Sequence, residues 1–297
     1  MSGVLIIDKP RGFTSFDVVA KVRRITGIKK CGHCGTLDPM ATGVMTVLLG
    51  GATRFADLIP DSDKSYVAGI RPGIVTDTLD ITGKVIEQNE VTAGPEEFER
   101  AAMSFTGRIR QTPPMYSAVS VNGRRLYSLA RQGIEVERPE REVTIYSLRV
   151  LSRDDVTGDY TLEVDCSSGT YIRTLADDIG RKLGCGAVLT SLRRVKANGF
   201  TGSSSITLEE LEKAALEGGL GDCVIPIDSL FKEYPVLTVS EAQSKRFSNG
   251  GFLSVDKLRD CKGNGLYRVY SPEELFLGLG EMSDGENLMV KKLYFDR

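Results

Sequence analysis

The alternation of apolar and polar residues predicts a chain that is richer in strands than in helices. Strand character is present in five segments: residues 3–10, 66–70, 83–86, 143–150 and 160–166. Apolar residues recur at helical spacing in three segments: 14–26, 96–105 and 171–183. The continuous apolar run 44-VMTVLLG-50 is typical of a buried strand or a short helix. Strands interrupted by helices in this irregular order favour an α+β fold with a mostly antiparallel central sheet and flanking helices.

The pattern changes near residue 233. The acidic stretch 207–222 predicts a connecting helix, and beyond about Tyr234 short apolar runs are separated by glycines and polar turns. We therefore expect two domains, one at residues 1–233 and a small β-rich one at 234–297.

The composition is that of an ordinary globular protein. Of the 297 residues, 41% are hydrophobic and 26% are charged. The sequence has no apolar run near the roughly 20 residues that cross a bilayer, and its first residues lack the pattern of a signal peptide. The expectation is a cytoplasmic protein that does not associate with membranes.

The cysteine content predicts free thiols and no metal site. Six cysteines are spread thinly along the chain. Cys31 and Cys34 form a C-x-x-C, but the sequence has no second C-x-x-C, and its only histidine, His33, lies between the two. A structural zinc site needs four such ligands.

The formal net charge is −2, yet the charges are segregated along the chain. Residues 108–131 and 181–196 each carry five cations and no acid, and residues 9–30 carry seven cations against Asp17 alone. Such runs are typical of a face that meets nucleic-acid phosphates, although a solvated arginine surface is the alternative. Eight side chains are candidate contacts to an RNA backbone: Lys9, Arg108, Arg110, Arg124, Arg125, Arg131, Arg193 and Arg194.

The available chemical groups exclude several kinds of enzyme. One histidine cannot build a multi-histidine metal site, and the glycine patterns of phosphate-binding and dinucleotide-binding loops are absent from the sequence. The strongest remaining candidate is Asp38, in the glycine-rich loop 32-GHCGTLDPMATG-43. Pro39 biases Asp38 toward an extended backbone, and a carboxylate held in this way can act as a nucleophile. A structural aspartate in an Asp-Pro turn is the competing interpretation.

Four other side chains could complete such a site. Arg173 could keep a catalytic carboxylate charged and oriented, although Asp177, four residues further along the predicted helix, is a rival partner. Tyr66 and Tyr171 could each stack on a base, and Leu192 could line a pocket. All three could equally be core residues.

Several of these segments together resemble the TruB family of bacterial tRNA pseudouridine-55 synthases. Six segments carry the resemblance, in the order that the family has them: GVLIIDKPRGFTSFDVV, GHCGTLDPMATGV, DSDKSY, GIVTDTLDITG, QTPPMYSAVSVNGRRLYSLARQGIEV and CSSGTYIRTLADDIGRKLGCGAVLTSLRR. The C-terminal region is similar, more weakly, to the small PUA-type β domain of bacterial members. The resemblance implies a pseudouridine synthase catalytic domain at 1–233 with a T-arm-binding insert at about 90–142, and a PUA-like RNA-binding domain at 234–297.

The resemblance also implies an activity and a site. The enzyme would be an isomerase that flips out the uridine at position 55 of the tRNA T-loop and exchanges its C1′–N1 bond for a C1′–C5 bond. Asp38 would be the nucleophile, Arg173 its ion-pair partner, and Tyr66 would stack on the base and handle a proton. Three further residues would contact the substrate: His33, Tyr171 and Leu192. No cofactor is implied, and the enzyme would act as a monomer without guide RNA or protein partner.

Two other interpretations compete with this one. An enzyme of the same class could depend on a separate guide RNA, and activity on a bare T-arm hairpin would separate that case. An RNA-binding or tRNA-folding protein could have lost catalysis, but the joint presence of Asp38, Tyr66 and Arg173 argues against this. Whether the aspartate attacks C1′ or the ring C6 stays open.

Overall fold

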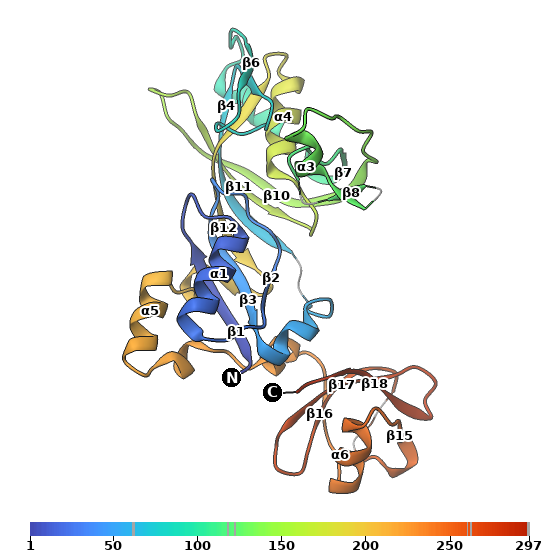
Figure 1. Ribbon diagram of the computed structural model, residues 1–297. Coiled ribbons are helices and arrows are strands. Elements are labelled where there is room, and N and C mark those ends of the chain that lie inside the picture. The colour runs from blue at the N-terminus through green and yellow to red at the C-terminus, as the bar shows by residue number, and fades with distance from the viewer. Residues whose placement is uncertain (61–62, 118, 122, 260, 262, 296–297) are drawn as a thin grey trace.

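The computed structural model describes residues 1–60, 63–117, 119–121, 123–259, 261 and 263–295. It is elongated, with a small domain at one end (Figure 1). Asp61 and Ser62, in the DSDKSY segment, are outside the described residues. In the part of the chain that is described, no helix is long and apolar enough to cross a membrane.

One large sheet forms the centre of residues 1–233. Its main strands run in the order β1-β3-β12-β4-β11-β10-β7, while β2 pairs with β3 and β13 with β12. The strand bounds are β1 Gly3–Lys9, β2 Cys31–Cys34, β3 Thr42–Leu49, β4 Lys64–Pro72, β7 Gly107–Gln111, β10 Arg141–Arg153, β11 Tyr160–Cys166, β12 Ala187–Ala197 and β13 Phe200–Thr201. The short β12–β3 pairing is parallel and the other described pairings of this sheet are antiparallel. The expected α+β fold with a mostly antiparallel sheet is confirmed.

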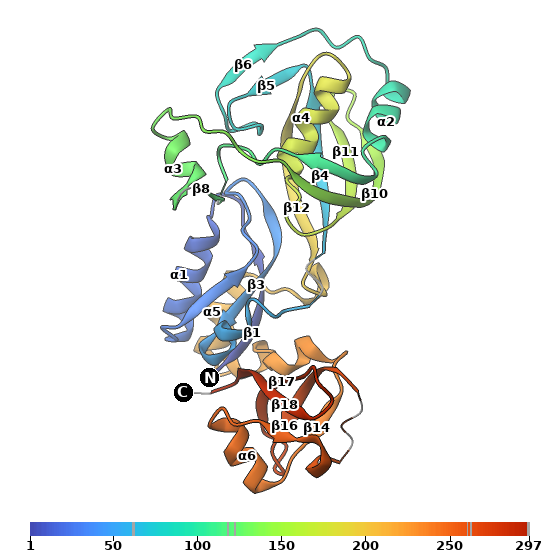
Figure 2. The same cartoon turned by 90° about the vertical axis from the view of Figure 1, so that its right-hand side faces the viewer.

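Helices cover this sheet at both ends (Figures 1 and 2). Helices α1 (Ser15–Thr26) and α5 (Leu208–Leu216) pack together at the β1–β3 end, and α2 (Pro95–Met103) and α4 (Ile172–Lys182) pack at the other. All three helices expected from apolar spacing are confirmed to within two residues at each end. They form where apolar residues make one buried face, as the buried Leu175 does in α4.

Shorter elements complete the domain. Two ribbons lie outside the large sheet: β5 (Ile74–Thr76) with β6 (Val85–Gln88), and β8 (Ser120–Val121) with β9 (Arg124–Arg125). Short 3-10 helices are η1 Gly50–Phe55, η2 Gly202–Ser204, η3 Leu220–Cys223, η4 Ile227–Phe231 and, in the small domain, η5 Val255–Lys257. The connecting helix expected over 207–222 is shorter than predicted, because Gly218 takes a left-handed φ of +80° soon after α5 ends.

Strand β12 was not expected from the sequence, although it lies at the centre of the sheet between β3 and β4. Its sequence AVLTSLRRVKA places Ser191 and two arginines among the apolar residues, so the period of two is lost. Two register shifts against β4 add to the irregularity.

The expected insert at about 90–142 is only partly separate from the sheet. Phe98 of α2 is buried and its ring stacks on that of Tyr160, with 3.7 Å between the ring centroids. Strand β7 pairs with β10, so both elements belong to the main body. What stands apart in Figure 2 is the later part, with the β8–β9 ribbon and helix α3 (Leu126–Ala130).

The C-terminal residues form a second sheet with its own core. The strand order is β14-β16-β17-β18-β15. The bounds are β14 Val236–Thr238, β15 Leu253–Ser254, β16 Gly265–Tyr270, β17 Phe276–Met282, β18 Asn287–Leu293 and helix α6 Glu241–Ser248. The curled sheet is the PUA-like, β-rich domain that was expected. Helix α6 was not expected, because its sequence EAQSKRFS offers a single buried residue, Phe247.

An aromatic cluster joins the two domains. Phe55 of η1 lies 6.0 Å from Phe276 and 6.2 Å from Tyr294, between ring centroids. Phe231 of η4 also contacts Phe55, with 5.8 Å between the ring centroids. The small domain is therefore packed on the end of the large one, opposite the ribbons.

Candidate active site

The loop between β2 and β3 holds Asp38 in a fixed place. Ser15, at the start of α1, accepts a hydrogen bond from the Leu37 amide at 2.9 Å. The Gly12 amide donates to the Pro39 carbonyl at 2.7 Å. Gly43 closes the loop at a φ of +103°, where a Cβ would lie 2.2 Å from the Arg194 carbonyl oxygen. Only glycine fits there, which explains one glycine of this loop.

Arg173 holds the carboxylate of Asp38 from the second position of α4. Its Nε lies 2.9 Å from Oδ2 and its Nη2 donates to Oδ1 at 3.0 Å, which is a two-pronged ion pair. The rival partner Asp177 pairs instead with Arg181, at 2.8 Å. The structure therefore resolves the alternative that spacing left open, in favour of the pair between Asp38 and Arg173.

Further contacts fix the guanidinium itself. Arg173 donates to the Thr78 carbonyl at 3.1 Å and to the Tyr116 carbonyl at 2.8 Å. A second carboxylate, Asp80, lies 3.8 Å from its Nη1. Asp80 is buried and accepts hydrogen bonds from the hydroxyls of Thr78 and Thr82. Sequence reasoning missed Asp80, since the segment TDTLDITG reads only as a polar turn.

Burial raises the pKa of the Asp38 carboxyl, and Asp80 adds to the rise. The Arg173 guanidinium is the largest opposing influence on that pKa, followed by a smaller effect of Lys9. The charged form of Asp38 thus depends on its arginine partner.

Tyr66, Tyr171 and Leu192 meet Asp38 and Arg173 around one cavity of about 560 Å³. We call this the catalytic cavity. In the sheet, Tyr66 pairs with Arg194 of β12, two residues from Leu192, so Tyr66 and Leu192 share a face. Five residues that the sequence singled out separately thus line a single space.

Tyr66 is suited to stacking. Its side chain is nearly buried, and burial raises the pKa of its phenol to about 12, with the Arg194 guanidinium opposing the rise. The phenol is therefore neutral near pH 7. Tyr171 caps the start of α4, and its backbone is held by Gln111, whose side chain accepts from the Tyr171 amide at 3.0 Å and donates to its carbonyl at 3.3 Å.

His33 lies in β2, next to the catalytic cavity but not among the residues that line it. Its ring makes an edge contact with Phe16, at 6.2 Å between centroids, and Phe16 is 76% exposed. Burial lowers the pKa of the imidazole, so it is neutral at pH 7. An exposed phenylalanine beside a neutral imidazole makes an apolar rim at the loop, which the sequence did not reveal.

Two of the eight expected RNA contacts are wrong. Lys9 and Arg194 are both fully buried. Lys9 donates to the carbonyls of Pro10 and Pro39, at 3.0 and 3.4 Å, and burial lowers its pKa to about 8. Arg194 donates to the carbonyls of Val44, at 2.7 Å, and Gly35, at 3.2 Å. Both cations stabilise the loop from inside, so neither reaches a phosphate.

The other six lie at the surface with different neighbours. Arg193 forms an ion pair with Asp8 at 2.7 Å. The side chains of Arg108 and Arg110 are 80% and 77% exposed, and each lies 3.9 Å from a glutamate of the facing chain segment. A stretch of sequence that contains no acid can therefore have acidic neighbours in the folded protein. Three more are exposed in the segment with β9 and α3: Arg124, Arg125 and Arg131. Of these, Arg125 also lines the catalytic cavity.

The cavity holds polar groups that the sequence did not single out. Lys64, Arg141 and the residues 168–170 lie around it. Among the described residues, no group of three or more histidine, cysteine, aspartate or glutamate side chains is placed to hold a metal ion. The site thus has an oriented carboxylate, which can attack an electrophilic carbon. The cavity around it is rich in cations and has an aromatic wall, against which a flat ring can stack.

Comparison with protein families covers nearly the whole chain. Residues 23–172 match the TruB family pseudouridylate synthase (N terminal domain), residues 173–232 the tRNA pseudouridylate synthase B C-terminal domain, and residues 235–293 the Pseudouridine synthase II TruB, C-terminal. A protein of Clostridium acetobutylicum named tRNA pseudouridine synthase B is 44% identical, over 99% of this chain and all of that one. One of Pseudomonas fluorescens with the same name is 42% identical, over 99% and 95%.

Solved structures agree on the fold. A chain in the crystal structure of a Cbf5-Nop10-Gar1 complex superposes with a TM-score of 0.73 at 26% identity, over 99% of this chain and 85% of that one. A chain in the structure of an H/ACA RNP bound to a substrate RNA containing 2′-deoxyuridine has a TM-score of 0.72 at 24% identity, over 99% and 86%. Fold and site together define a pseudouridine synthase, an isomerase. Within that class, the chain belongs to the TruB family.

Proposed function

We propose that this protein converts the uridine at position 55 in the T-loop of tRNA to pseudouridine, with Asp38 as nucleophile. The observation that carries the proposal is the two-pronged pair of Arg173 and Asp38, both of which line the catalytic cavity. The substrate is supported by the relatives of 42–44% identity, whose names state tRNA pseudouridine synthase B.

The reaction begins with extrusion of the nucleotide. A uridine inside a folded loop is out of reach, and flipping it out costs a few kcal/mol. Stacking on an aromatic ring contributes about 1–3 kcal/mol per base, so Tyr66 can offset much of that cost. His33 and Phe16, at the rim, are placed to contact the opened loop.

The carboxylate then attacks the nucleotide. The C1′–N1 bond breaks, the uracil turns within the cavity, C5 bonds to C1′, and the bond between the carboxylate and the nucleotide breaks again, which frees Asp38. N1 gains a proton and C5 loses one, so the atoms of substrate and product balance without water or a nucleotide. Because the pKa of Tyr66 is about 12, its phenol is already protonated near neutral pH, which favours stacking over proton abstraction as its first role.

We propose further that the enzyme acts alone, as a monomer. Its relatives match it over nearly their full length, and their names state the synthase itself, tRNA pseudouridine synthase B. The segment with β9 and α3 places Arg124, Arg125 and Arg131 beside the cavity side of the molecule, where they can hold the T-arm backbone. These contacts would make binding strongly dependent on salt.

Tritium release tests the proposal. The purified chain is mixed with a T-arm hairpin whose uridines carry tritium at C5, with no other RNA or protein. We expect release of one tritium per hairpin and a pseudouridine at the position equivalent to 55. Release that requires an added guide RNA would contradict stand-alone action, and binding of the hairpin without release would indicate an RNA-binding protein that has lost catalysis.

A further inference from the structure

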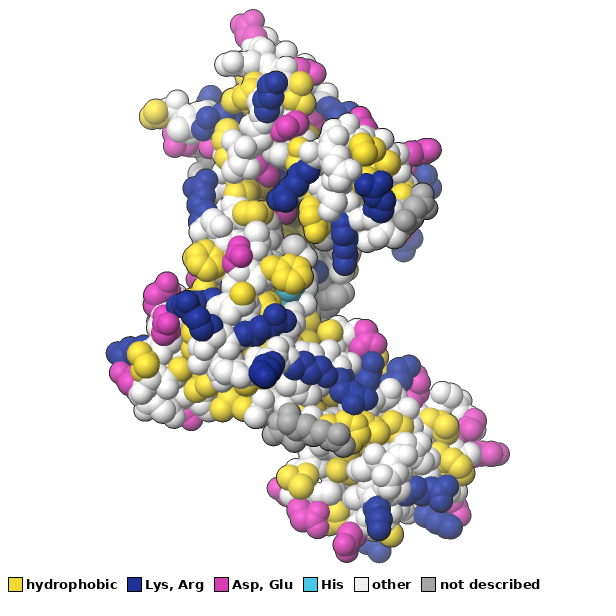
Figure 3. Space-filling view, viewed as in Figure 1, with side chains coloured by type: hydrophobic (Ala, Val, Ile, Leu, Met, Phe, Trp, Pro, Cys, Tyr) yellow, Lys and Arg dark blue, Asp and Glu magenta, His cyan; other side chains and the backbone are white. Residues whose placement is uncertain are grey.

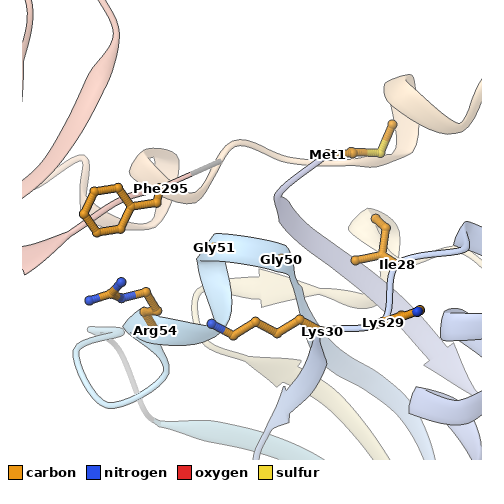
Figure 4. Close-up of a pocket in the computed structure, with 8 residues that line it drawn as sticks. All are labelled: Met1, Ile28, Lys29, Lys30, Gly50, Gly51, Arg54 and Phe295. Carbon is orange, nitrogen blue, oxygen red and sulfur yellow. The ribbon is translucent and has the colours of Figure 1, made fainter. Parts of the chain in front are cut away.

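A second cavity lies where the large domain and the C-terminal domain meet. Its volume is about 500 Å³, and six of the residues around it matter here: Lys29, Lys30, Gly50, Gly51, Arg54 and Phe295 (Figure 4). We call it the basic pocket. Three of its side chains are cations, and none of the described residues that line it is acidic. A hollow with this lining suits an anion.

The fold builds this pocket through close backbone contacts. A Cβ at Gly51 would lie 2.1 Å from the Phe295 carbonyl oxygen, and one at Gly50 would lie 2.3 Å from the Ser2 hydroxyl. The Gly50 amide donates to the Lys30 carbonyl at 2.8 Å, which ties the lysine pair to η1. The cations therefore sit on backbone that is fixed from both domains.

These cations differ from others nearby in having no acid partner. Lys292 pairs with Asp57 at 3.1 Å, and Lys21 pairs with Glu212 at 2.7 Å. Within the described part of the chain, no ion pair engages the two lysines of the pocket or Arg54. The guanidinium of Arg54 lies 5.0 Å from the centre of the Phe295 ring. Exposed cations without acids are free to receive phosphate.

The distance to the catalytic cavity bears on what could bind. Strand β3 begins beside the Asp38 loop and ends at the pocket, and its eight residues span about 25 Å at about 3.3 Å each. Taking about 3.4 Å per stacked base pair, as in duplex DNA, that span corresponds to about seven base pairs. A nucleotide flipped into the catalytic cavity cannot reach the pocket, but a longer RNA can.

We propose that the basic pocket binds a phosphate group of the tRNA substrate outside the T-arm hairpin. The inference rests on the proposed function, because it takes tRNA as the substrate. Figure 3 shows a row of Lys and Arg side chains across the molecule just above the C-terminal domain, so this face of the molecule carries an extended cationic surface. Ile28 and Phe295 give the pocket an apolar side that fits a ribose, which a bare ion would not use.

The test compares two RNAs and two double variants. Lys29→Glu/Lys30→Glu reverses two exposed charges of the pocket. Arg100→Glu/Lys213→Glu makes the same change in net charge on exposed helix surfaces elsewhere. Dissociation constants are measured over a range of salt for a full-length tRNA transcript and for a T-arm hairpin with a stem of about five base pairs, which is too short to span the distance above.

We expect the pocket variant to lose affinity for the full-length tRNA and to bind and turn over the hairpin like the wild type. Loss of one phosphate contact lowers the salt slope by about 0.8, so between about 50 and about 200 mM salt the wild type loses about threefold more tRNA affinity than the variant. The control variant should keep the wild-type slope. Equal weakening for both RNAs, or no weakening for the tRNA, would overturn the inference. Hairpin turnover by the wild type tests the proposed function separately.

Discussion

At the scale of single residues, the site depends on one ion pair between distant parts of the chain. Arg173 contacts both carboxylate oxygens of Asp38, and its other N–H groups donate hydrogen bonds to two backbone carbonyls. The carboxylate is therefore oriented before any RNA arrives, which lowers the entropic cost of reaching the reactive geometry. The same guanidinium opposes the rise in the pKa of Asp38 that burial causes.

Replacing Arg173 with lysine should damage catalysis although the charge is kept. The ammonium of a lysine cannot form the two parallel hydrogen bonds that Arg173 makes to the carboxylate oxygens of Asp38. A small misplacement of a reacting group can lower the rate by about 100-fold. We expect kcat on the hairpin to fall by about that factor. The acid limb of the pH–rate profile should move to higher pH, because a weaker partner leaves the pKa of Asp38 higher. Arg181→Lys, at the exposed partner of Asp177, is the matched control and should leave both quantities unchanged.

Lys9 should make stability depend on pH in the alkaline range. Its pKa is about 8 in the folded protein against 10.5 ordinarily, so between these values the unfolded chain binds more protons than the folded one. Stability due to this group therefore rises as pH increases from about 8 to about 10.5. The unfolding free energy of the wild type minus that of Lys9→Met should grow by about 1–3 kcal/mol over that range in urea titrations. A difference that stays flat or shrinks with pH would mean that Lys9 is not held in this environment.

At the scale of elements, the sequence predicts the helices and strands in which apolar residues recur at a regular spacing. The strands that alternate and the helices with one apolar face lie where they were expected. Strand β12 was missed because Arg194 looks like a surface residue and is in fact buried against the carbonyls of Val44 and Gly35. Local patterns cannot show such partners, since they come from β3 and from the loop before it.

The same limit applies to the site. The glycine-rich loop singled out Asp38 as a candidate in the sequence. Only the folded structure could decide whether Asp38 or Asp177 is the partner of Arg173, because Asp38 and Arg173 are 135 positions apart in the chain. The family resemblance anticipated that pair and three further side chains of the catalytic cavity, Tyr66, Tyr171 and Leu192. It did not anticipate that Asp80 lies near Arg173, or that Lys9 is buried. A lysine is usually exposed, so the sequence did not indicate that the Lys9 side chain points into the protein.

The start of β3 gives a sharp test of the packing between elements. Gly43→Ala places a Cβ 2.2 Å from the Arg194 carbonyl oxygen at a backbone φ of +103°. We expect a loss of about 2–4 kcal/mol in unfolding free energy and reduced turnover, because the paired strands β3 and β12 must separate to relieve the clash. Gly32→Ala, in the same loop motif, has open space around its Cβ and should change stability by less than about 1 kcal/mol. Similar effects of the two substitutions on the melting temperature would contradict this packing.

At the scale of the whole molecule, the aromatic cluster couples the domains. Phe276 of the small domain contacts the rings of Phe55 and Tyr294. Phe276→Ala should cost about 2–3 kcal/mol, since a large partly buried ring is lost, and calorimetry should then resolve a separate, earlier transition of the small domain. Phe252→Ala, at an exposed ring of the same domain, should leave one transition. A single transition in both variants would show that the cluster is not what couples the domains.

The most direct measurement follows tritium release from a C5-labelled T-arm hairpin by the wild type and by Asp38→Asn, together with the affinity of each for the hairpin. The asparagine keeps the size of the side chain and removes the proposed nucleophile, while the RNA-binding surface is untouched. We predict turnover by the wild type, at least about 1,000-fold slower turnover by the variant, and affinities within about threefold of each other. Asp155→Asn, at a 90% exposed carboxylate, should match the wild type. Turnover by Asp38→Asn within about tenfold of the wild-type rate would contradict the assignment of Asp38 as the nucleophile.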